Sequence, residues 1–271
     1  MTEYKRPQQP EQTKMLSAKL NQAGAPNKVS SFDVQLRDWF KKHSRKMQTL
    51  AGSKEEANKI ITSLIFVAQR NPKLMTCTME SIGECLMQSA QLKLYPGPLQ
   101  ECAYVPFGNR ATFMPQYQGL CKLAYNSGVV RSIATEVVYA NDLFEFELGT
   151  NAYLRHVPTL SDNRGERIAA WCVVKTTHGE VIIVKPISFI EGIRKRSPAG
   201  NKKDSPWNTS DDDYDAMARK TVLKQALKTI PKSSDLAAAI QVDNAVESGS
   251  VDNVVTHIEP VTDPTPEETK E

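Results

Sequence analysis

The chain has 271 residues, of which 40% are hydrophobic and 24% are charged, a composition typical of a globular protein with one large domain or two small ones. No apolar run approaches the roughly 20 residues that a membrane-spanning helix needs. No apolar segment follows the charged N-terminus, so we expect no secretory signal, no membrane contact and a cytoplasmic location. The five cysteines include no CxxC pair, so we expect reduced cysteines in the core.

The net charge of +3 conceals an uneven distribution of charge along the chain. Nine acidic residues and one lysine follow residue 234, so residues 1–234 carry 33 basic and 22 acidic side chains, a net charge of +11. A basic body favours a polyanionic partner, and the acidic end indicates a separate role in contacting a protein or masking the basic body.

The first third of the chain predicts an N-terminal arm followed by helices. Residues 1–30 are rich in Gln, Pro, Asn and Lys, which is typical of a mobile arm. Three helices are expected within 31–95. The second begins at a capping box formed by Ser53 and Glu56, and the third covers about 79–91.

Residues 101–128 predict a β-hairpin followed by a short helix. Gly108-Asn109 lies between two half-apolar runs, and these residue types best tolerate the positive φ of a hairpin turn. After Pro115 the apolar spacing becomes helical, and Gly128 suits a left-handed helix end. The unit would present a rigid projecting turn with cationic and amide groups around it.

The chain after Gly128 predicts several strands, over 130–140, 143–148, 153–157, 167–177 and 181–186. A turn at His178-Gly179 would join the last two. Because both of these strands are apolar on both faces, we expect both to lie centrally in a sheet with a helix on at least one side.

A final helix begins at Ser210 and ends before Pro231. From about residue 234 the composition predicts an acidic disordered tail, 234–271, in which 237–242 could form a short recognition helix. The expected fold class is α+β, with one core over 31–233 that is helical to residue 95 and α+β from residue 96.

The sequence offers no convincing catalytic, metal or cofactor site. No Gly-Lys dipeptide occurs, so a phosphate-cradling GxxxxGK[ST] loop is absent, and the four histidines lack the spacing of a zinc site. The run Asp211–Asp215 could bind Mg²⁺. A simpler interpretation is that acidic residues at a helix N-terminus complement the helix dipole.

Basic residues cluster in the C-terminal half, and Lys220, Lys224 and Lys228 recur at helical spacing on one stripe. The pattern favours a groove that follows a nucleic-acid backbone. Trp207 and Tyr117 could stack on bases, and Phe113 could do so or belong to the core. The expected DNA-binding residues are Asn109, Arg110, Phe113, Gln116, Tyr117, Lys122, Lys175, Lys185, Arg194, Lys195, Arg196, Lys202, Lys203, Trp207, Arg219, Lys220 and Lys224.

Three stretches resemble phage RecT recombinases, the RecT/Redβ class of single-strand annealing proteins. They are YVPFGNRATFMPQYQGLCKLAYNSGVVRSI at 104–133, VVYANDLFEF at 137–146 and SPWNTSDDDYDAMARKTVLKQALKTIPKS at 205–233. The resemblance covers roughly 30–232. The hairpin-helix and the block from Trp207 to Thr221 are its most specific parts.

The resemblance implies a non-enzymatic protein that binds single-stranded DNA and anneals complementary strands without ATP. It implies a β-β-β-α core, assembly into rings or helical filaments, and work with a phage exonuclease and the host single-strand-binding protein, in a bacterial host cell. Two alternatives stay open on the residues alone: a metal-dependent nuclease built on Asp211–Asp215, and a structural protein that packages nucleic acid.

Overall fold

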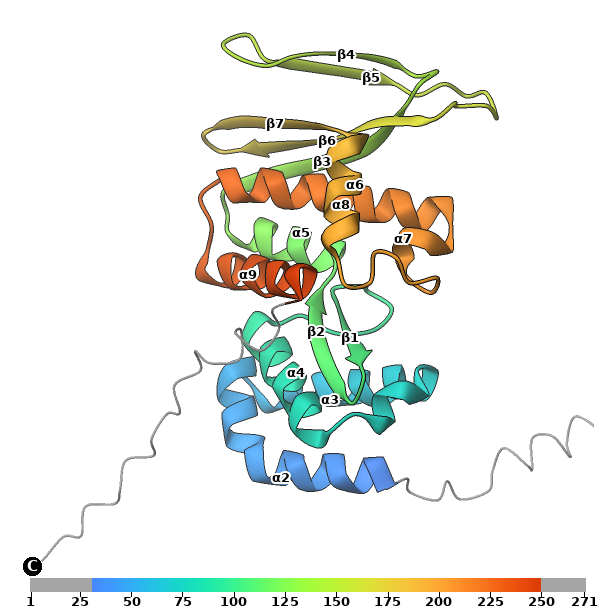
Figure 1. Ribbon diagram of the computed structural model, residues 1–271. Helices are drawn as coiled ribbons and strands as arrows, with labels where there is room; N and C mark the ends of the chain where they lie inside the picture. Colours follow the sequence, from blue (N-terminus) through green and yellow to red (C-terminus); the bar gives the residue numbers. More distant parts are fainter. Residues whose placement is uncertain (1–30, 250–271) are drawn as a thin grey trace, which may run out of the picture. The chain divides into compact units, whose positions relative to one another are not determined.

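The computed structural model describes residues 31–249 (Figure 1). The chain divides into two compact units, residues 1–42 and 43–271, and helix α2 (Ser31–Ala51) crosses this boundary. The predicted arm 1–30 and the end of the predicted tail, 250–271, lie outside the described residues. Within 31–249, no helix is long and apolar enough to cross a membrane.

The helical region predicted before the hairpin is confirmed. After α2 it consists of α3 (Lys54–Arg70), the 3-10 helix η1 (Pro72–Thr76) and α4 (Met79–Leu92). Ser53 caps α3, because its Oγ accepts a hydrogen bond from the Glu56 amide at 3.1 Å. The Glu56 carboxylate contacts Lys59 at 2.6 Å and the Tyr95 hydroxyl, so it links α3 to the chain beyond α4.

The hairpin-helix unit is also confirmed, as β1 (Cys102–Phe107), β2 (Arg110–Pro115) and α5 (Tyr117–Asn126). Phe107 pairs with Arg110 across the turn, where Gly108 has a φ of 60°. Helix α5 packs closely on the segment before β1, because a Cβ at Gly119 would lie 2.0 Å from the Glu101 carbonyl oxygen.

A three-stranded antiparallel sheet has the order β3-β6-β7 and consists of β3 (Val130–Tyr139), β6 (Arg167–Thr176) and β7 (Gly179–Pro186). One face of β6 buries Ala170, Cys172 and Val174 on the side that packs against α8. Only β6 is central, so the prediction that both strands of this pair lie centrally is wrong for β7. The turn lies at Thr177-His178, one residue earlier than predicted.

The chain between β3 and β6 forms a separate two-stranded sheet, of β4 (Leu143–Glu147) and β5 (Tyr153–Val157). Figure 1 shows this hairpin on the opposite face of the three-stranded sheet from α8. The two sheets and the hairpin β1–β2, combined with helices, confirm the expected α+β class with antiparallel sheets.

Four helices complete the described chain: α6 (Ile187–Arg196), α7 (Pro206–Thr209), α8 (Asp211–Thr229) and α9 (Ser234–Ser248). Helix α9 packs against β2 and α5, and it buries Leu236, Ala239, Ile240 and Val246. The prediction of a disordered tail from residue 234 is therefore wrong over 234–248. The reason is that these apolar residues recur on one face of a helix and find a partner surface in the core. All five cysteines are buried and free, as expected.

Replacing Gly119 with alanine should destabilise the fold, because the new Cβ meets a backbone carbonyl that cannot move aside easily. We expect Gly119→Ala to lower the free energy of unfolding by about 1–3 kcal/mol, measured by urea unfolding. Gly192→Ala in α6 is the matched control, because nothing lies within 4 Å of its Cβ position; it should be neutral or stabilising by up to ~1 kcal/mol. Equal effects at the two positions would contradict this account of how α5 packs.

Candidate nucleic-acid interface

A cleft of about 760 Å³ lies among β1, the start of α5, β3 and α8, and we call it the β1–α8 cleft. Its volume falls within the roughly 300–1,000 Å³ that is typical of ligand sites. Its lining combines apolar residues of β1 with the amide side chains of glutamines such as Gln116 and Gln118. Tyr117 and Arg219 are also part of the lining. Four predicted site residues therefore meet here: Gln116, Tyr117, Arg219 and Lys220.

Helix α5 begins at this cleft. Gln116 is the residue before its first turn, and its side chain does not cap the helix. The positive end of the helix dipole therefore lies on the side of the cleft that Gln116, Tyr117 and Gln118 line. The Tyr117 hydroxyl shares a hydrogen bond of 3.0 Å with Thr135 of β3. Burial raises the pKa of Tyr117 to about 12, so its hydroxyl is neutral at physiological pH.

Arg219 is a half-exposed cation in the cleft lining. Its Nη1 lies 3.9 Å from Glu136 of β3, and the two side chains are 38% and 39% exposed. Such an exposed ion pair contributes little to stability, so a phosphate can compete for the guanidinium at small cost. Asp213, the acidic residue of the lining, accepts a hydrogen bond from Ser210 at 2.8 Å.

The loop between α6 and α7 lies near the cleft without being part of its lining. Lys202 places its Nζ 5.5 Å from the ring centre of Phe107, which follows the lining residue Pro106 in β1, and Pro206, the first residue of α7, is part of the lining. Lys203 in the same loop is exposed, as are Lys195 and Arg196 at the end of α6. These four predicted residues present their charges to solvent.

Comparison with known proteins identifies the family. The model of the RecT family matches residues 58–258, which include every residue that lines the β1–α8 cleft. The chain belongs to the RecT family. Protein RecT of Escherichia coli (strain K12) is 30% identical over 186 residues, which cover 64% of this chain and 65% of that protein. The match thus spans slightly less than two thirds of that RecT.

Two aromatic residues expected at the DNA-binding surface of this RecT-family chain belong to the core. Phe113 is 1% exposed and lies 6.3 Å from the ring centre of Tyr104. Trp207 is 4% exposed and packs edge-on against Tyr214 at 5.7 Å. Because each ring is enclosed by neighbouring side chains, the prediction that Phe113 and Trp207 contact bases is wrong.

The hairpin tip and Lys122 lie outside the cleft lining. The Asn109 carbonyl accepts a hydrogen bond from the residue before α4, and Arg110 pairs with Glu84 of α4 at 2.9 Å. The tip is therefore tied to α4, although Asn109 itself is exposed. Lys122 donates to both carboxylate oxygens of Glu101 at 2.9 Å, so its charge helps to fix α5 beside β1.

Lys175 and Lys185 lie on the three-stranded sheet, away from the cleft lining. Lys175 is exposed and lies 3.7 Å from Glu180 across the β6–β7 pair. Lys185 lies 5.1 Å from the ring centre of Phe189. The structure therefore does not bring these two lysines into one groove with Arg219.

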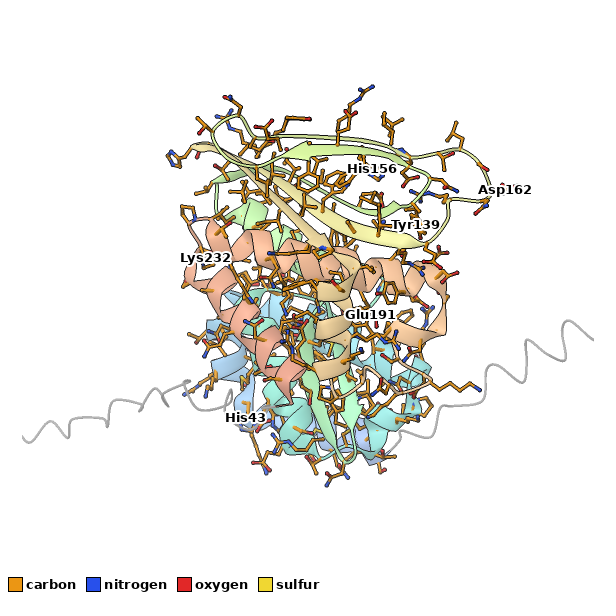
Figure 2. The ribbon with its side chains drawn as sticks, turned by 45° about the horizontal axis from the view of Figure 1, so that its top comes forward. His43, Tyr139, His156, Asp162, Glu191 and Lys232 are labelled. Atoms are coloured by element: carbon orange, nitrogen blue, oxygen red, sulfur yellow. The ribbon has the colours of Figure 1, made fainter. Side chains whose placement is uncertain are left out.

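A second cavity, of about 810 Å³, contains Arg194 and part of the Asp211–Asp215 run. Arg167 holds two of these carboxylates, with Asp215 at 2.6 Å and Asp211 at 3.0 Å, and Arg194 lies 3.3 Å from Glu191, the residue of this group that Figure 2 labels. Each arginine is thus matched by a carboxylate. Among residues 31–249, no group of three His, Cys, Asp or Glu side chains could hold a metal ion.

Two lysines of the α8 stripe, Lys220 and Lys224, face α9. The Lys220 ammonium lies 2.6 Å from one oxygen of Asp243, and the Lys224 ammonium lies 2.6 Å from the other oxygen and from Glu247. The side chains of Lys220, Lys224 and Asp243 are 6%, 2% and 1% exposed. The prediction that Lys224 lines a DNA groove is wrong, and Lys220, although part of the cleft lining, already has its charge neutralised.

Burial alone would raise the pKa of Asp243, but the two ammonium groups reverse this and hold it below its ordinary value. A carboxylate whose folded pKa lies below its unfolded pKa contributes stability above the unfolded value, which is about 3.9. That contribution is lost as the pH falls through the folded pKa. The α8–α9 contact should therefore weaken in acid.

Several lining residues were missed by the sequence reasoning, notably Gln100, Gln118, Thr135 and Met217. Neutral side chains do not contribute to a basic cluster, which was the signal used to predict the site. A threonine within a predicted strand is assigned to the sheet and not to a binding surface. Met217 does lie in the block from Trp207 to Thr221 that resembles the RecT family, which is the one signal that could have singled it out.

Asp243→Asn should be strongly destabilising, because it leaves two buried ammonium groups with too little negative charge. We expect a loss of about 3–5 kcal/mol in the free energy of unfolding at neutral pH, measured by urea denaturation. Asp235→Asn, on the exposed first turn of the same helix, is the control and should cost no more than about 1 kcal/mol. The difference in the free energy of unfolding between wild type and Asp243→Asn should become smaller as the pH falls below 4. A difference in this free energy that does not depend on pH would refute the role of the carboxylate.

Proposed function

We propose that this chain binds single-stranded DNA and anneals complementary strands during homologous recombination, without hydrolysing a nucleotide. The observation that carries the proposal is its membership of the RecT family, whose matched region contains the whole β1–α8 cleft. We further propose that the protein works as a ring or filament, and that its partners include a phage exonuclease and the host single-strand-binding protein.

In the proposed complex, the sugar-phosphate chain passes through the β1–α8 cleft. Arg219 exchanges its weak pair with Glu136 for a phosphate, and the first amides of α5 bind another. Lys202 and Lys203 neutralise phosphates at the rim. Contacts of this kind hold the backbone and leave the Watson–Crick edges free to pair.

Base pairing supplies the free energy of the reaction, since stacking contributes about 1.4 kcal/mol per base-pair step. The protein's contribution is kinetic and electrostatic: it reduces the repulsion between two phosphate chains and holds the strands extended while they find their register. We assign this activity to residues 31–248, which extends the predicted core through α9 because Asp243 and Glu247 neutralise lysines of α8.

The proposal is tested by mixing two complementary oligonucleotides, one with a fluorophore and one with a quencher, with and without ATP. We expect the protein to speed quenching well above the protein-free rate at low salt, and ATP to make no difference. Strand cleavage in Mg²⁺ would favour the nuclease at Asp211–Asp215. Equal binding of duplex and single strands with no faster pairing would favour a packaging protein.

Removing the charge of Arg219 should weaken DNA binding without unfolding the protein. We expect Arg219→Ala to reduce affinity for a single-stranded oligonucleotide and the annealing rate. The slope of log affinity against log salt should fall by about 0.7, the value for one lost phosphate contact, measured by fluorescence anisotropy at several salt concentrations. Lys202→Ala should likewise reduce the affinity for single-stranded DNA, the annealing rate and the salt slope.

The matched control is Lys59→Ala, which removes an exposed lysine from α3 that is not part of the cleft lining. It should leave both the affinity and the salt slope at wild-type values. If Arg219→Ala and Lys202→Ala both anneal as wild type does, the path of DNA through this cleft is wrong, whatever the protein's overall activity.

A further inference from the structure

An exposed arginine lies at the α3 side of the β1–α8 cleft. Helix α3 contributes Val67 and Asn71 to the lining. Arg70 comes three residues after Val67 and directly before Asn71, and it is exposed. Because residues three apart are neighbours on the surface of a helix, Arg70 lies beside the lining residues of α3. The cleft therefore has a cation at its α3 edge as well as Arg219 on α8.

Arg70 differs from the arginines described above in having no acidic partner. Arg219, Arg194 and Arg167 each form an ion pair with a carboxylate. Within the described range 31–249, Arg70 forms no ion pair and its side chain donates no hydrogen bond; its contact is with an aromatic ring. The N–H donors at the edge of its guanidinium, which suit bidentate binding of a phosphate, are therefore available.

The aromatic ring belongs to Phe66, which lies one helical turn before Arg70. The Arg70 Cζ is 4.3 Å from the centre of this ring. Phe66 is 39% exposed, so its ring faces solvent and the arginine more than the core. A guanidinium that is already held against a ring loses less side-chain freedom when it binds a ligand. Phe66 therefore prepares Arg70 for binding without using its hydrogen-bond donors.

Neutral amides accompany Arg70 on this side of the cleft. The Asn71 side chain makes no capping hydrogen bond to η1. Gln100 lies in the loop before β1 and has a φ of 51°, a strained value for a residue other than glycine and one that is typical of binding sites. The acidic residue of the lining, Asp213, belongs to α8. The α3 side thus offers hydrogen-bond donors to an anion and no carboxylate to repel it.

We propose that Arg70 is a phosphate-binding residue of the cleft and that Phe66 positions it. The role of Arg70 rests on the proposed function and extends its DNA path from Arg219 on α8 to the α3 side. Figure 1 shows β1 between these two helices. One strand then has a phosphate held on each side of the apolar β1 wall, so its nucleotides stay extended and their pairing edges stay free.

The charge of Arg70 is tested through the salt dependence of binding to a single-stranded oligo-dT, measured by fluorescence anisotropy. We expect Arg70→Ala to lower the affinity at low salt about tenfold or more. The slope of log affinity against log salt should fall by about 0.7, and by about 1.4 in Arg70→Ala/Arg219→Ala, because the two contacts are separate. Arg70→Gln, which keeps most of the side chain without its charge, should lower the slope as Arg70→Ala does.

The matched control is Lys54→Ala. Lys54 is an exposed cation at the other end of α3, and within 31–249 it too forms no ion pair. Its removal should leave the affinity and the salt slope at wild-type values. Urea unfolding of all these variants should match the wild type, since the substituted side chains are at least partly exposed.

The positioning role of Phe66 gives a different result from loss of a charge. Phe66→Ala keeps the Arg70 guanidinium, so it should leave the salt slope unchanged and lower the affinity about two- to fivefold, the value of an exposed cation–π contact. Phe66→Tyr keeps the ring and should bind as the wild type does. Equal affinities for Phe66→Ala and the wild type would remove Phe66 from the site.

Wild-type affinity and slope in Arg70→Ala would overturn the proposal and leave the Arg70–Phe66 contact as one that serves only α3. A loss of affinity with no change in slope would also overturn it, because no phosphate contact would have been removed. Failure of the proposed function has a different signature, in which the wild type itself binds no single-stranded DNA or does not speed pairing.

Discussion

The structure depends on the neutralisation of two buried lysines. Lys220 and Lys224 lie on the face of α8 that meets α9, and a buried ammonium group without a carboxylate would be prohibitively costly. Asp243 and Glu247 supply the opposite charge, so α9 must fold onto α8 for the core to be stable. The negative charges of Asp243 and Glu247 are therefore structural.

This constraint also decides the electrostatics of the candidate site. Because Lys220 and Lys224 are used internally, the phosphate binding proposed for the β1–α8 cleft would depend on Arg219, on the amides that begin α5, and on Lys202 and Lys203 of the loop between α6 and α7. The cleft is thus lined mainly by neutral and apolar groups, with cations at a few points. Such a surface can hold a backbone firmly at low salt and still let a strand adjust its register while pairing proceeds.

Local signals in the sequence predicted most of the elements, because they act within a few residues. The caps at Ser53 and Ser210 and the turn at Gly108 each depend on chemistry that neighbouring residues supply. The site was predicted less well because it depends on partners far along the chain. Lys220 meets an aspartate 23 residues away, and nothing near Trp207 in the sequence indicates that it packs into the core. A lysine that is exposed and a lysine that is buried and paired occur at the same helical spacing in the sequence. They can be distinguished only when the helix that faces them is known.

Strand β3 connects the β1–α8 cleft with the base of the β4–β5 hairpin. Thr135 and Glu136 on this strand contact Tyr117 and Arg219 at the cleft, and Asp142, just beyond its end, fixes the β4–β5 hairpin. An extended strand rises roughly 3.3 Å per residue and changes length little. The distance between the cleft and the base of the β4–β5 hairpin is therefore set by the backbone geometry of β3. A strand of DNA held in the cleft, as proposed, would lie at a constant distance from the hairpin.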